Sequence, residues 1–401
     1  MVQVGVFGYG TVGSGVVEVL TKNADLIAKK VKDEVKVKAI LDLRDFPGDE
    51  HEDKIVHDVD AIISDPEIKI ICETMGGIGA AYKFTKMALE AGKSVCTSNK
   101  ELVAAYGPEL LALAKANNCN YRFEASVGGG IPIIRPLIDA VTADKIESVT
   151  GIVNGTTNYM LTKMANEGAE FDDVLKQAQA NGYAEANPAA DIEGLDAMRK
   201  LSILSSLVYG KTVKCENIST EGITKISSRD FKYAKELGCV IKLLAKYSDE
   251  ETGAYSMVAP FMVNESNPLY HVNDVFNAIM VRGNMLGDAM FYGRGAGKLP
   301  TASAVCGDVV ECAKSLGVNV DVDWKNEEVA LDGLKASKRA FFVRVNKDSK
   351  EACLKAFNNV KEVNAGFYDE FAFVTEEMTE EAFENAASAS GELINRVRIE
   401  K

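Results

Sequence analysis

Residues 2–15, VQVGVFGYGTVGSG, decide the fold of the N-terminal part of the chain. A short apolar run is followed by Gly8-x-Gly10-x-x-Gly13, and helical spacing then continues over Val16–Leu26. A strand, this glycine pattern and a helix in that order are typical of a dinucleotide-binding unit. Gly8 permits a tight turn, Gly10 lets a pyrophosphate approach the backbone, and Gly13 allows the helix to pack closely on the strand.

Strands and helices alternate after this unit, which predicts a parallel, doubly wound α/β sheet. The expected strands are 35–41, 68–73, 94–97 and 121–124, and the clearest helices are 80–91 and 108–117. Ligands of such sheets bind outside the carboxyl ends of the strands. The segments that follow the strands, GYGTVG, DLR, TMGG, SNK and SVGGG, should therefore meet at one edge.

The cofactor preference depends on two residues after the second strand. Asp42 would bind the ribose hydroxyls of NAD, whereas Arg44 would favour the 2′-phosphate of NADP. Both are present, so NADP and NAD both stay open. Lys100 is a further candidate, although a surface lysine at a helix start explains it equally well. The remaining candidate contacts lie in the same segments and in a second glycine-rich loop, 293–305: Thr11, Val12, Thr74, Ser98 and Gly297.

The stretch Gly182–Lys200, GYAEANPAADIEGLDAMRK, carries the strongest candidate for chemistry. Asp196 and Lys200 lie four residues apart on a helix that should be buried on most sides. A structural ion pair explains them, and so does a catalytic lysine with its orienting carboxylate. Glu185, Asp191 and Asp196 suit a substrate that carries an ammonium group. A lysine beside them can stabilise an oxyanion and deliver a proton to it.

Composition excludes several classes of function. The chain of 401 residues suggests two or three domains, and its net charge of −14 argues against general binding to nucleic acid or anionic membranes. It contains no run of about 18 apolar residues, so no membrane span is expected. Eight cysteines without a CxxC pair indicate buried thiols in a reducing cytoplasm. With three histidines and no HExxH motif, no transition-metal site is expected. The first residues already form a strand, which is unlike a signal peptide.

Two further regions have recognisable patterns. The loop EASVGGGIP, residues 124–132, offers carbonyl oxygens and one carboxylate to a hard cation, although a hinge between domains is the simpler interpretation. The last 65 or so residues follow the order βαββαβ, which is the ferredoxin-like pattern. Its strands are expected at 338–345, 361–366, 370–374 and 395–399, and its helices at 349–358 and 379–390.

The segments GYGTVG, ETMGG, TSNKEL, EASVGGGIP, VNGTTNYML, GYAEANPAADIEGLDAMRK and GRGAGKLPTASAV occur in this order, and over residues 1–318 the chain resembles homoserine dehydrogenase. The resemblance implies reduction of L-aspartate 4-semialdehyde to L-homoserine with NADH or NADPH, on the route to threonine, isoleucine and methionine. It implies a Rossmann domain over 1–135, completed by a helix at about 300–318. An α+β substrate-binding and dimerisation domain over 136–299 and a homodimer or higher homo-oligomer are also implied.

The same resemblance assigns roles to individual residues. Lys200 would be the general acid and base, Glu185 and Asp196 would contact homoserine with Asp191 nearby, and Lys100 would lie close to the nicotinamide. Thr156, in NGTTNY, would contact the substrate. A sodium site would fall on Glu124 and the backbone carbonyls of Val127, Gly129 and Ile131. Many family members carry Arg-Asp-Leu where this chain has Leu41-Asp42-Leu43, so any preference for NADP depends on Arg44.

The C-terminal residues 336–401 look like an ACT regulatory domain, which in this family often senses threonine. Here Asn346–Ser349 replaces the usual Asp-x-Pro-Gly turn. A threonine effector and a role in assembly alone therefore both stay open.

Two other functions are less consistent with the sequence. A phosphorylating semialdehyde dehydrogenase needs a nucleophilic cysteine beside a base, and Cys306 and Cys312 instead lie in an apolar helix. A non-catalytic protein that senses nucleotides or amino acids would not require the carboxylate–lysine stretch. A neutral Lys200 acting as base predicts that homoserine oxidation is favoured at alkaline pH.

Overall fold

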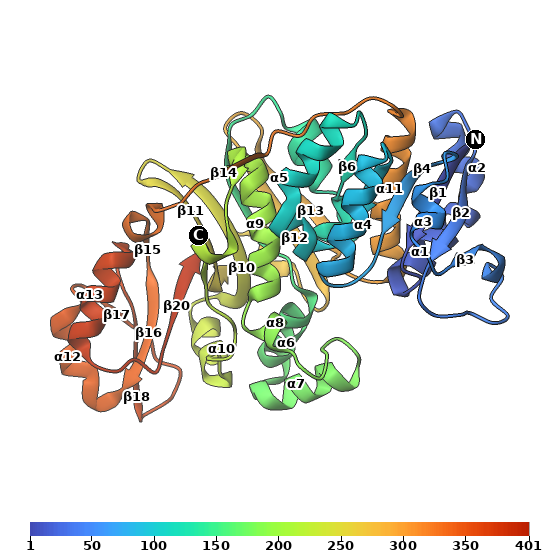
Figure 1. The fold of residues 1–401 in the computed structure, drawn as a ribbon. Helices are drawn as coiled ribbons and strands as arrows, with labels where there is room; N and C mark the ends of the chain where they lie inside the picture. The colour runs from blue at the N-terminus through green and yellow to red at the C-terminus, as the bar shows by residue number, and fades with distance from the viewer. Residues whose placement is uncertain (401) are drawn as a thin grey trace. The chain divides into compact units, whose positions relative to one another are not determined.

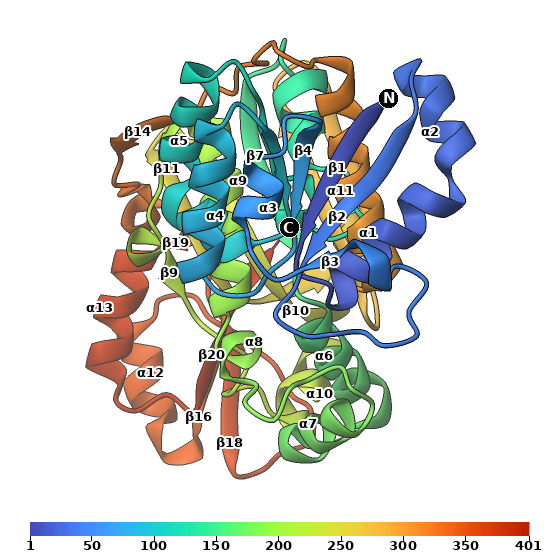
Figure 2. The same ribbon diagram turned by 45° about the vertical axis from the view of Figure 1, so that its right-hand side comes forward.

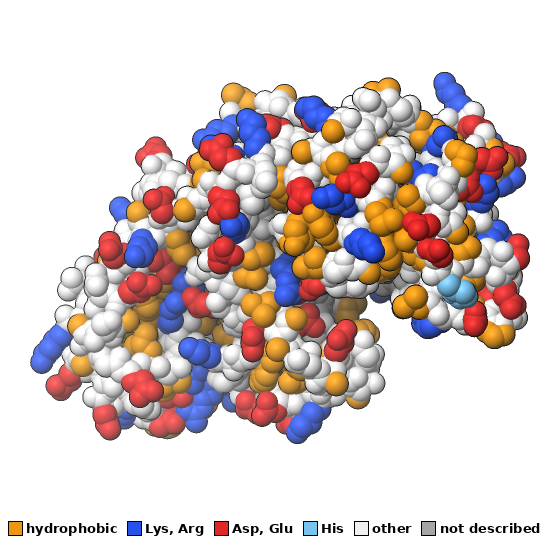
Figure 3. Space-filling view, in the orientation of Figure 1, with side chains coloured by type: hydrophobic (Ala, Val, Ile, Leu, Met, Phe, Trp, Pro, Cys, Tyr) orange, Lys and Arg blue, Asp and Glu red, His pale blue; other side chains and the backbone are white. Residues whose placement is uncertain are grey.

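The computed structural model describes residues 1–400, which form two compact units. The first unit comprises residues 1–143, 206–212 and 293–329, and the second comprises 144–205, 213–292 and 330–401. Among the described residues, no helix is long and apolar enough to cross a bilayer. On the face presented in Figure 3, acidic and basic side chains are interspersed.

The first unit is built on a parallel sheet with the strand order β3-β2-β1-β4-β5-β6. The strands are β1 (Val2–Phe7), β2 (Val35–Leu41), β3 (Ile55–Val56), β4 (Ile68–Glu73), β5 (Ser94–Thr97) and β6 (Tyr121–Arg122). The strand order reverses at β1, which is where such sheets bind their ligands. The predicted doubly wound parallel sheet is confirmed.

Helices cover both faces of this sheet: α1 (Thr11–Lys22), α2 (Ala24–Val31), α3 (Asp60–Ile63), α4 (Gly79–Glu90), α5 (Lys100–Ala116) and α11 (Lys298–Lys314). In Figure 2, α4 and α5 lie on one side of β1 and β4, and α1 and α11 lie on the other. Val4 and Val6 of β1 pack with Val16 of α1 and Val305 of α11 in one buried cluster. A helix from late in the chain thus completes the first unit.

Three boundaries in the first unit differ from the predictions. The helix expected at 16–26 begins at Thr11 and is interrupted at Asn23, whose backbone leaves the helical conformation. The helix expected at 108–117 begins at Lys100, because the Asn99 side chain caps it, and Pro108 is accommodated inside it. The strand expected to reach Glu124 ends at Arg122.

The second unit is organised on a mixed sheet with the order β13-β12-β7-β10-β11-β20-β16-β18-β17, and β9 pairs with β11. Its first strands are β7 (Ile146–Ile152), β9 (Ser219–Thr220), β10 (Cys239–Glu250), β11 (Gly253–Asn264), β12 (Phe276–Gly283) and β13 (Gly287–Arg294). Its helices include α6 (Gly155–Glu167), α7 (Phe171–Ala180), α8 (Ala189–Ile192), α9 (Leu195–Tyr209) and α10 (Ser228–Glu236). β12 and β13 are consecutive in the chain and neighbours in the sheet, so they form a hairpin.

The end of the chain has the predicted βαββαβ order. Its elements are β16 (Phe341–Asn346), α12 (Lys350–Ala356), β17 (Lys361–Glu362), β18 (Glu370–Val374), α13 (Glu380–Ser390) and β20 (Asn395–Glu400). β17 is shorter than the strand predicted at 361–366. β20 lies between β16 and β11 and pairs with β11 in parallel, so these strands continue the mixed sheet (Figure 1).

Candidate functional site

The glycine loop after β1 has the geometry of a ligand cradle. A Cβ atom added at Gly13 would lie 1.9 Å from the carbonyl oxygen of Gly8, so only glycine fits there. A Cβ added at Gly10 would meet nothing within 4 Å, so the space above this residue is open. Gly10 also precedes α1 without a side-chain cap, and the first N–H groups of the helix, including those of Thr11 and Val12, are available to an anion. The loop therefore fits a pyrophosphate.

One predicted residue, Thr74, bonds this loop, and another, Gly297, precedes a helix that packs against α1. The Thr74 hydroxyl donates to the carbonyl oxygens of Phe7 and Gly8, each at 2.9 Å. Gly297, with φ of +124°, precedes α11, and the next residue, Lys298, has its carbonyl oxygen 2.9 Å from a Cβ added at Gly15. The structure thus brings the second glycine-rich loop next to the first.

Asp42 and Arg44 form one polar group at the carboxyl end of β2. The Asp42 carboxylate accepts hydrogen bonds from the Tyr9 N–H at 2.8 Å and from the Arg44 guanidinium at 3.0 Å. The Arg44 guanidinium holds the pKa of the Asp42 carboxyl well below its usual range. Arg44 is largely exposed and lies 5.0 Å from the Phe46 ring centre. An ionised carboxylate and an exposed guanidinium are therefore presented together.

The segments after β4 and β5 are joined by a buried carboxylate that the sequence did not single out. Glu73 is fully buried and accepts hydrogen bonds from the Met75 N–H at 2.8 Å and the Thr97 hydroxyl at 2.5 Å. Its carbonyl oxygen accepts from the Ser98 N–H. Lys100 begins the helix that follows. Thr74, Ser98 and Lys100 therefore lie in connected segments.

In the second unit, the structure brings Asp191, Asp196 and Lys200 together. The Lys200 ammonium donates to Asp196 Oδ2 at 2.6 Å and to the Val153 carbonyl oxygen at 2.7 Å. Lys200 is 8% exposed and Asp196 is 4% exposed. Asn154 donates through one amide nitrogen to Asp191 at 2.7 Å and to Asp196 at 2.9 Å. The result is a buried ammonium surrounded by oxygen atoms.

Asn154 is a site residue that the sequence pattern did not single out. The Asn154 side chain accepts from the Thr157 N–H and is itself the cap. Thr156 instead donates its hydroxyl to the Tyr183 carbonyl oxygen at 2.6 Å, which ties α6 to the loop before α8. Glu185 is an exposed residue of that loop. An Asn-Gly pair directly before a helix was the available signal for the cap.

The loop proposed for a cation is packed against the second glycine-rich loop. A Cβ added at Gly129 would lie 2.4 Å from the Gly295 carbonyl oxygen. The buried Glu124 carboxylate accepts from the N–H groups of three consecutive residues, 133–135, and from Arg135 Nε at 3.1 Å. Both carboxylate oxygens of Glu124 therefore already accept hydrogen bonds from the start of the following helical turn. Within residues 1–400, no group of three or more His, Cys, Asp or Glu residues could hold a metal ion.

Cys306 and Cys312 are unsuited to nucleophilic catalysis. Burial raises the pKa of Cys306 to about 12, and Cys312 is fully buried in the same helix. These observations disfavour a phosphorylating dehydrogenase.

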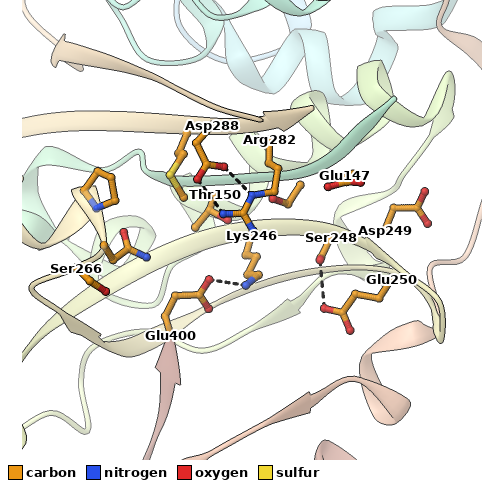
Figure 4. Close-up of a pocket in the computed structure, with 14 residues that line it drawn as sticks. Glu147, Thr150, Lys246, Ser248, Asp249, Glu250, Ser266, Arg282, Asp288 and Glu400 are labelled. Atoms are coloured by element: carbon orange, nitrogen blue, oxygen red, sulfur yellow. Dashed lines mark hydrogen bonds and ion pairs between the residues drawn. The ribbon is translucent and has the colours of Figure 1, made fainter. Parts of the chain in front are cut away.

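The second unit also contains two cavities away from Lys200. One, of about 410 Å³, lies on the polar face of the mixed sheet, where Lys246 pairs with Glu400 and Arg282 pairs with Asp288 (Figure 4). The other, of about 510 Å³, is lined by residues 220–226 and by 393–396 at the start of β20.

Comparisons with known proteins identify relatives over most of the chain. Residues 8–124 match the family model "Homoserine dehydrogenase, NAD binding domain", and residues 132–310 match "Homoserine dehydrogenase". The chain is 42% identical to the Synechocystis sp. homoserine dehydrogenase over 353 residues, which are 86% of this chain and 79% of that protein. It is 40% identical to the Bacillus subtilis enzyme over 323 residues, 80% of this chain and 74% of that one.

Solved structures agree with these matches. The homoserine dehydrogenase from Thiobacillus denitrificans has a TM-score of 0.88 at 33% identity, covering 100% of this chain and 98% of that chain. A hyperthermophilic archaeal homoserine dehydrogenase in complex with NADPH has a TM-score of 0.66 at 29% identity and covers 78% of this chain and 97% of that one.

Proposed function

Because the chain belongs to the homoserine dehydrogenase family, we propose that Lys200 is the general acid and base of its reaction. Homoserine dehydrogenase activity interconverts L-aspartate 4-semialdehyde and L-homoserine in amino-acid biosynthesis. Membership in this enzyme family sets aside the alternative of a protein that only senses nucleotides or amino acids. The observation that carries the proposal is the buried contact between Lys200 and Asp196 at 2.6 Å.

The chemistry assigned to Lys200 follows from its surroundings. The nicotinamide cofactor supplies the hydride when it is bound. Negative charge then develops on the aldehyde oxygen, where the Lys200 ammonium stabilises it and delivers a proton. In the oxidation direction the neutral amine removes that proton. Asp196 and the Val153 carbonyl oxygen orient the lysine, and Asn154 orients both aspartates.

The substrate's own charge accounts for the neighbouring carboxylates. Both substrates carry an ammonium group, for which Asp191 and Asp196 are the partners. Glu185 lies in the exposed loop that Thr156 holds, so we assign it to the substrate contact that forms when homoserine binds.

The test compares two lysines that each pair with a carboxylate four residues away on one helix. Lys200→Ala should lower kcat for homoserine oxidation by at least about 10²-fold. Lys163→Ala removes the exposed pair with Glu167 and should leave kcat unchanged. An active Lys200→Ala variant would exclude the general-acid role while leaving the family membership intact.

The cofactor is NAD or NADP, and we propose that Asp42 and Arg44 determine which one binds more tightly. The glycine loop, Thr74 and the segment before α11 would hold its pyrophosphate, and Ser98 and Lys100 would lie at its nicotinamide end. Support comes from the open space above Gly10 and from the polar pair that follows β2.

The loop 124–132 is the proposed site for a monovalent cation. We propose Na⁺ at the backbone carbonyls of Val127, Gly129 and Ile131, with Glu124 contributing through its backbone because its carboxylate is engaged elsewhere. Activity measured in sodium and in choline buffers of equal ionic strength tests this site.

A homodimer is the proposed assembly. Met290 and Tyr292 are exposed apolar side chains on β13, the last strand at one edge of the mixed sheet, and Met285 is exposed in the preceding turn. A second copy of the chain would cover these side chains. Light scattering on wild type and Tyr292→Glu tests it, since the charged variant should shift toward monomer.

An amino-acid effector, such as threonine, is proposed for the cavity at the start of β20. Glu221 and Arg396 both line this cavity and form an ion pair at 2.8 Å, so a zwitterion would bind by exchanging this pair for its own two charges, with Leu393 and Ile226 as apolar walls. Calorimetric titration of threonine into wild type and Arg396→Gln tests the site.

A further inference from the structure

Glu73 lies at the carboxyl end of β4, where the proposed cofactor segments meet. Its side chain is 0% exposed, and both carboxylate oxygens accept hydrogen bonds from residues of different segments. One oxygen accepts from the backbone N–H of Met75, in the segment after β4. The other accepts from the hydroxyl of Thr97, the last residue of β5. A charged group without such partners would be costly to bury here.

The contacts continue from Thr97 into the start of α5. Thr97 Oγ1 accepts from the Asn99 N–H at 2.9 Å. The Asn99 amide nitrogen donates back to the Gly77 carbonyl oxygen at 2.6 Å, and its amide oxygen caps α5 at Leu102. Thr97 and Asn99 therefore both donate hydrogen bonds to the segment 73–77, and Lys100 directly follows Asn99.

The same contacts extend to the glycine loop. Met75, whose backbone Glu73 holds, places its Cγ atom 3.1 Å from a Cβ added at Gly8. The Thr74 hydroxyl donates to the Gly8 carbonyl oxygen. Residues 74 and 75 are thus held by two neighbours: Gly8 contacts both of them, and Glu73 bonds the Met75 N–H.

We propose that Glu73 is a positioning residue for the reaction: through Met75 and Thr97 it fixes the two segments that hold the nicotinamide end of the cofactor. The proposal rests on the cofactor site described under the proposed function. Glu73 itself is enclosed by protein, so it acts through these neighbours and not by touching the cofactor. Without it, residues 74–77 and 98–100 would adopt more than one arrangement, and ordering them would oppose cofactor binding.

Two threonines provide a matched test. Thr97 and Thr85 are both 0% exposed, and valine has nearly the same shape as threonine. The Thr97 hydroxyl bonds Glu73, whereas the Thr85 hydroxyl has no hydrogen-bond partner in the structure. Calorimetric titration with NADPH and with NADH, together with kcat and KM for homoserine at saturating cofactor, is compared for Thr97→Val, Thr85→Val and Thr97→Ser.

The expected result separates positioning from stability. Thr97→Val raises the Kd of both cofactors about tenfold and lowers kcat, while the KM for homoserine changes less than about twofold. Thr97→Ser restores the wild-type values because it keeps the hydroxyl, and Thr85→Val binds both cofactors like wild type. Equal Kd and kcat values for Thr97→Val and Thr85→Val overturn the proposal.

A second variant covers the case in which Thr97→Val does not fold. Glu73→Gln keeps the size of the side chain and removes its charge, and it should raise the Kd of NADPH at least about fivefold. A Kd within twofold of wild type overturns the proposal. If wild type binds NADPH but does not oxidise homoserine, the proposed function fails while the positioning role is still measured by Kd.

Discussion

We propose that the choice between NAD and NADP depends on two side chains, Asp42 and Arg44. Arg44 is bound to Asp42 by two nitrogen–oxygen contacts of 3.0 Å, and it is exposed enough to turn toward a 2′-phosphate. Arg44→Ala should therefore raise the KM for NADP at least about tenfold, because a charged hydrogen-bonding partner of the phosphate is lost. The KM for NAD should change little, since Asp42 still accepts from the ribose.

The reciprocal variant completes this comparison. Asp42→Asn retains the hydrogen bond from the Tyr9 N–H but loses the negative charge that the ribose hydroxyls of NAD would meet. Asp42→Asn should therefore weaken the binding of NAD more than the binding of NADP. Equal effects of Arg44→Ala on both cofactors would show that this arginine only supports the structure of the loop.

Glu73 should also make stability depend on pH. Burial raises its pKa from 4.5 to about 7, although the bonds from Thr97 and Met75 lower it. Between these two values the folded state holds a proton that the unfolded state has released, so stability falls as pH rises. The contribution is up to about 1.4 kcal/mol per pH unit within this window. Glu73→Gln lacks it.

Urea unfolding at pH 5 and pH 8 measures this difference. The free energy of unfolding of Glu73→Gln minus that of wild type should be more positive at pH 8 than at pH 5, because only wild type loses this stability as pH rises. A difference that does not change with pH would show that the carboxyl group titrates at the same pH in both states.

Some residues of the candidate site could be predicted from the sequence, and others could not. Asp191, Asp196 and Lys200 were expected together because the i, i+4 spacing of the last two needs only local geometry. Asn154 and Glu73 were not expected, since their partners are 37 to 42 residues away for Asn154 and 24 residues away for the Thr97 contact of Glu73. Only the tertiary fold brings these pairs into contact.

At the scale of elements, one close contact links the segment before α10 to the proposed substrate site. A Cβ added at Gly222 would lie 2.1 Å from the Ile192 carbonyl oxygen and 2.5 Å from the Glu193 Cα atom. The Ile223 N–H also donates to Ile192 at 2.8 Å. Ile192 is the last residue of α8 and directly follows Asp191. Any substitution at Gly222 must therefore displace the end of α8.

Gly222→Ala should lower kcat/KM for homoserine about 10²-fold, because displacements of about 1 Å at reacting groups have effects of this size. The Kd of NADPH should stay unchanged. Gly79→Ala is the matched control, since a Cβ there meets nothing within 4 Å. Unaltered homoserine kinetics in Gly222→Ala would mean that the backbone yields without moving Asp191.

Elements with strong local signals were predicted well, and those that depend on tertiary contacts were not. β1, β2, β4 and β5 match the predicted ranges because each is a short apolar run bounded by glycine or polar residues. β3 has two residues and exists only through its pairing with β2, so no sequence pattern marks it. The break between α1 and α2 at Asn23 likewise falls within a continuous helical pattern.

At the scale of the whole chain, the C-terminal residues are structurally continuous with the rest of the second unit. β20 pairs in parallel with β11 at Phe261, Met262 and Val263, which are fully buried. Arg344 of β16 also forms a buried ion pair with Asp230 of α10 at 2.7 Å. A regulatory module that is merely tethered would have neither feature.

Deletion of residues 336–401 should therefore destabilise the enzyme instead of yielding a deregulated one. Removal of β20 leaves the N–H and C=O groups of β11 unpaired at an apolar edge, which is a template for aggregation. It also removes Arg344, the buried ion-pair partner of Asp230. Size-exclusion chromatography of the truncated chain should show aggregates or no recoverable protein.

Arg344→Met should remain soluble and unfold at lower urea than wild type, because it loses the ion pair but keeps the strand. A monodisperse, active truncated chain would instead place the C-terminal residues outside the cooperative unit.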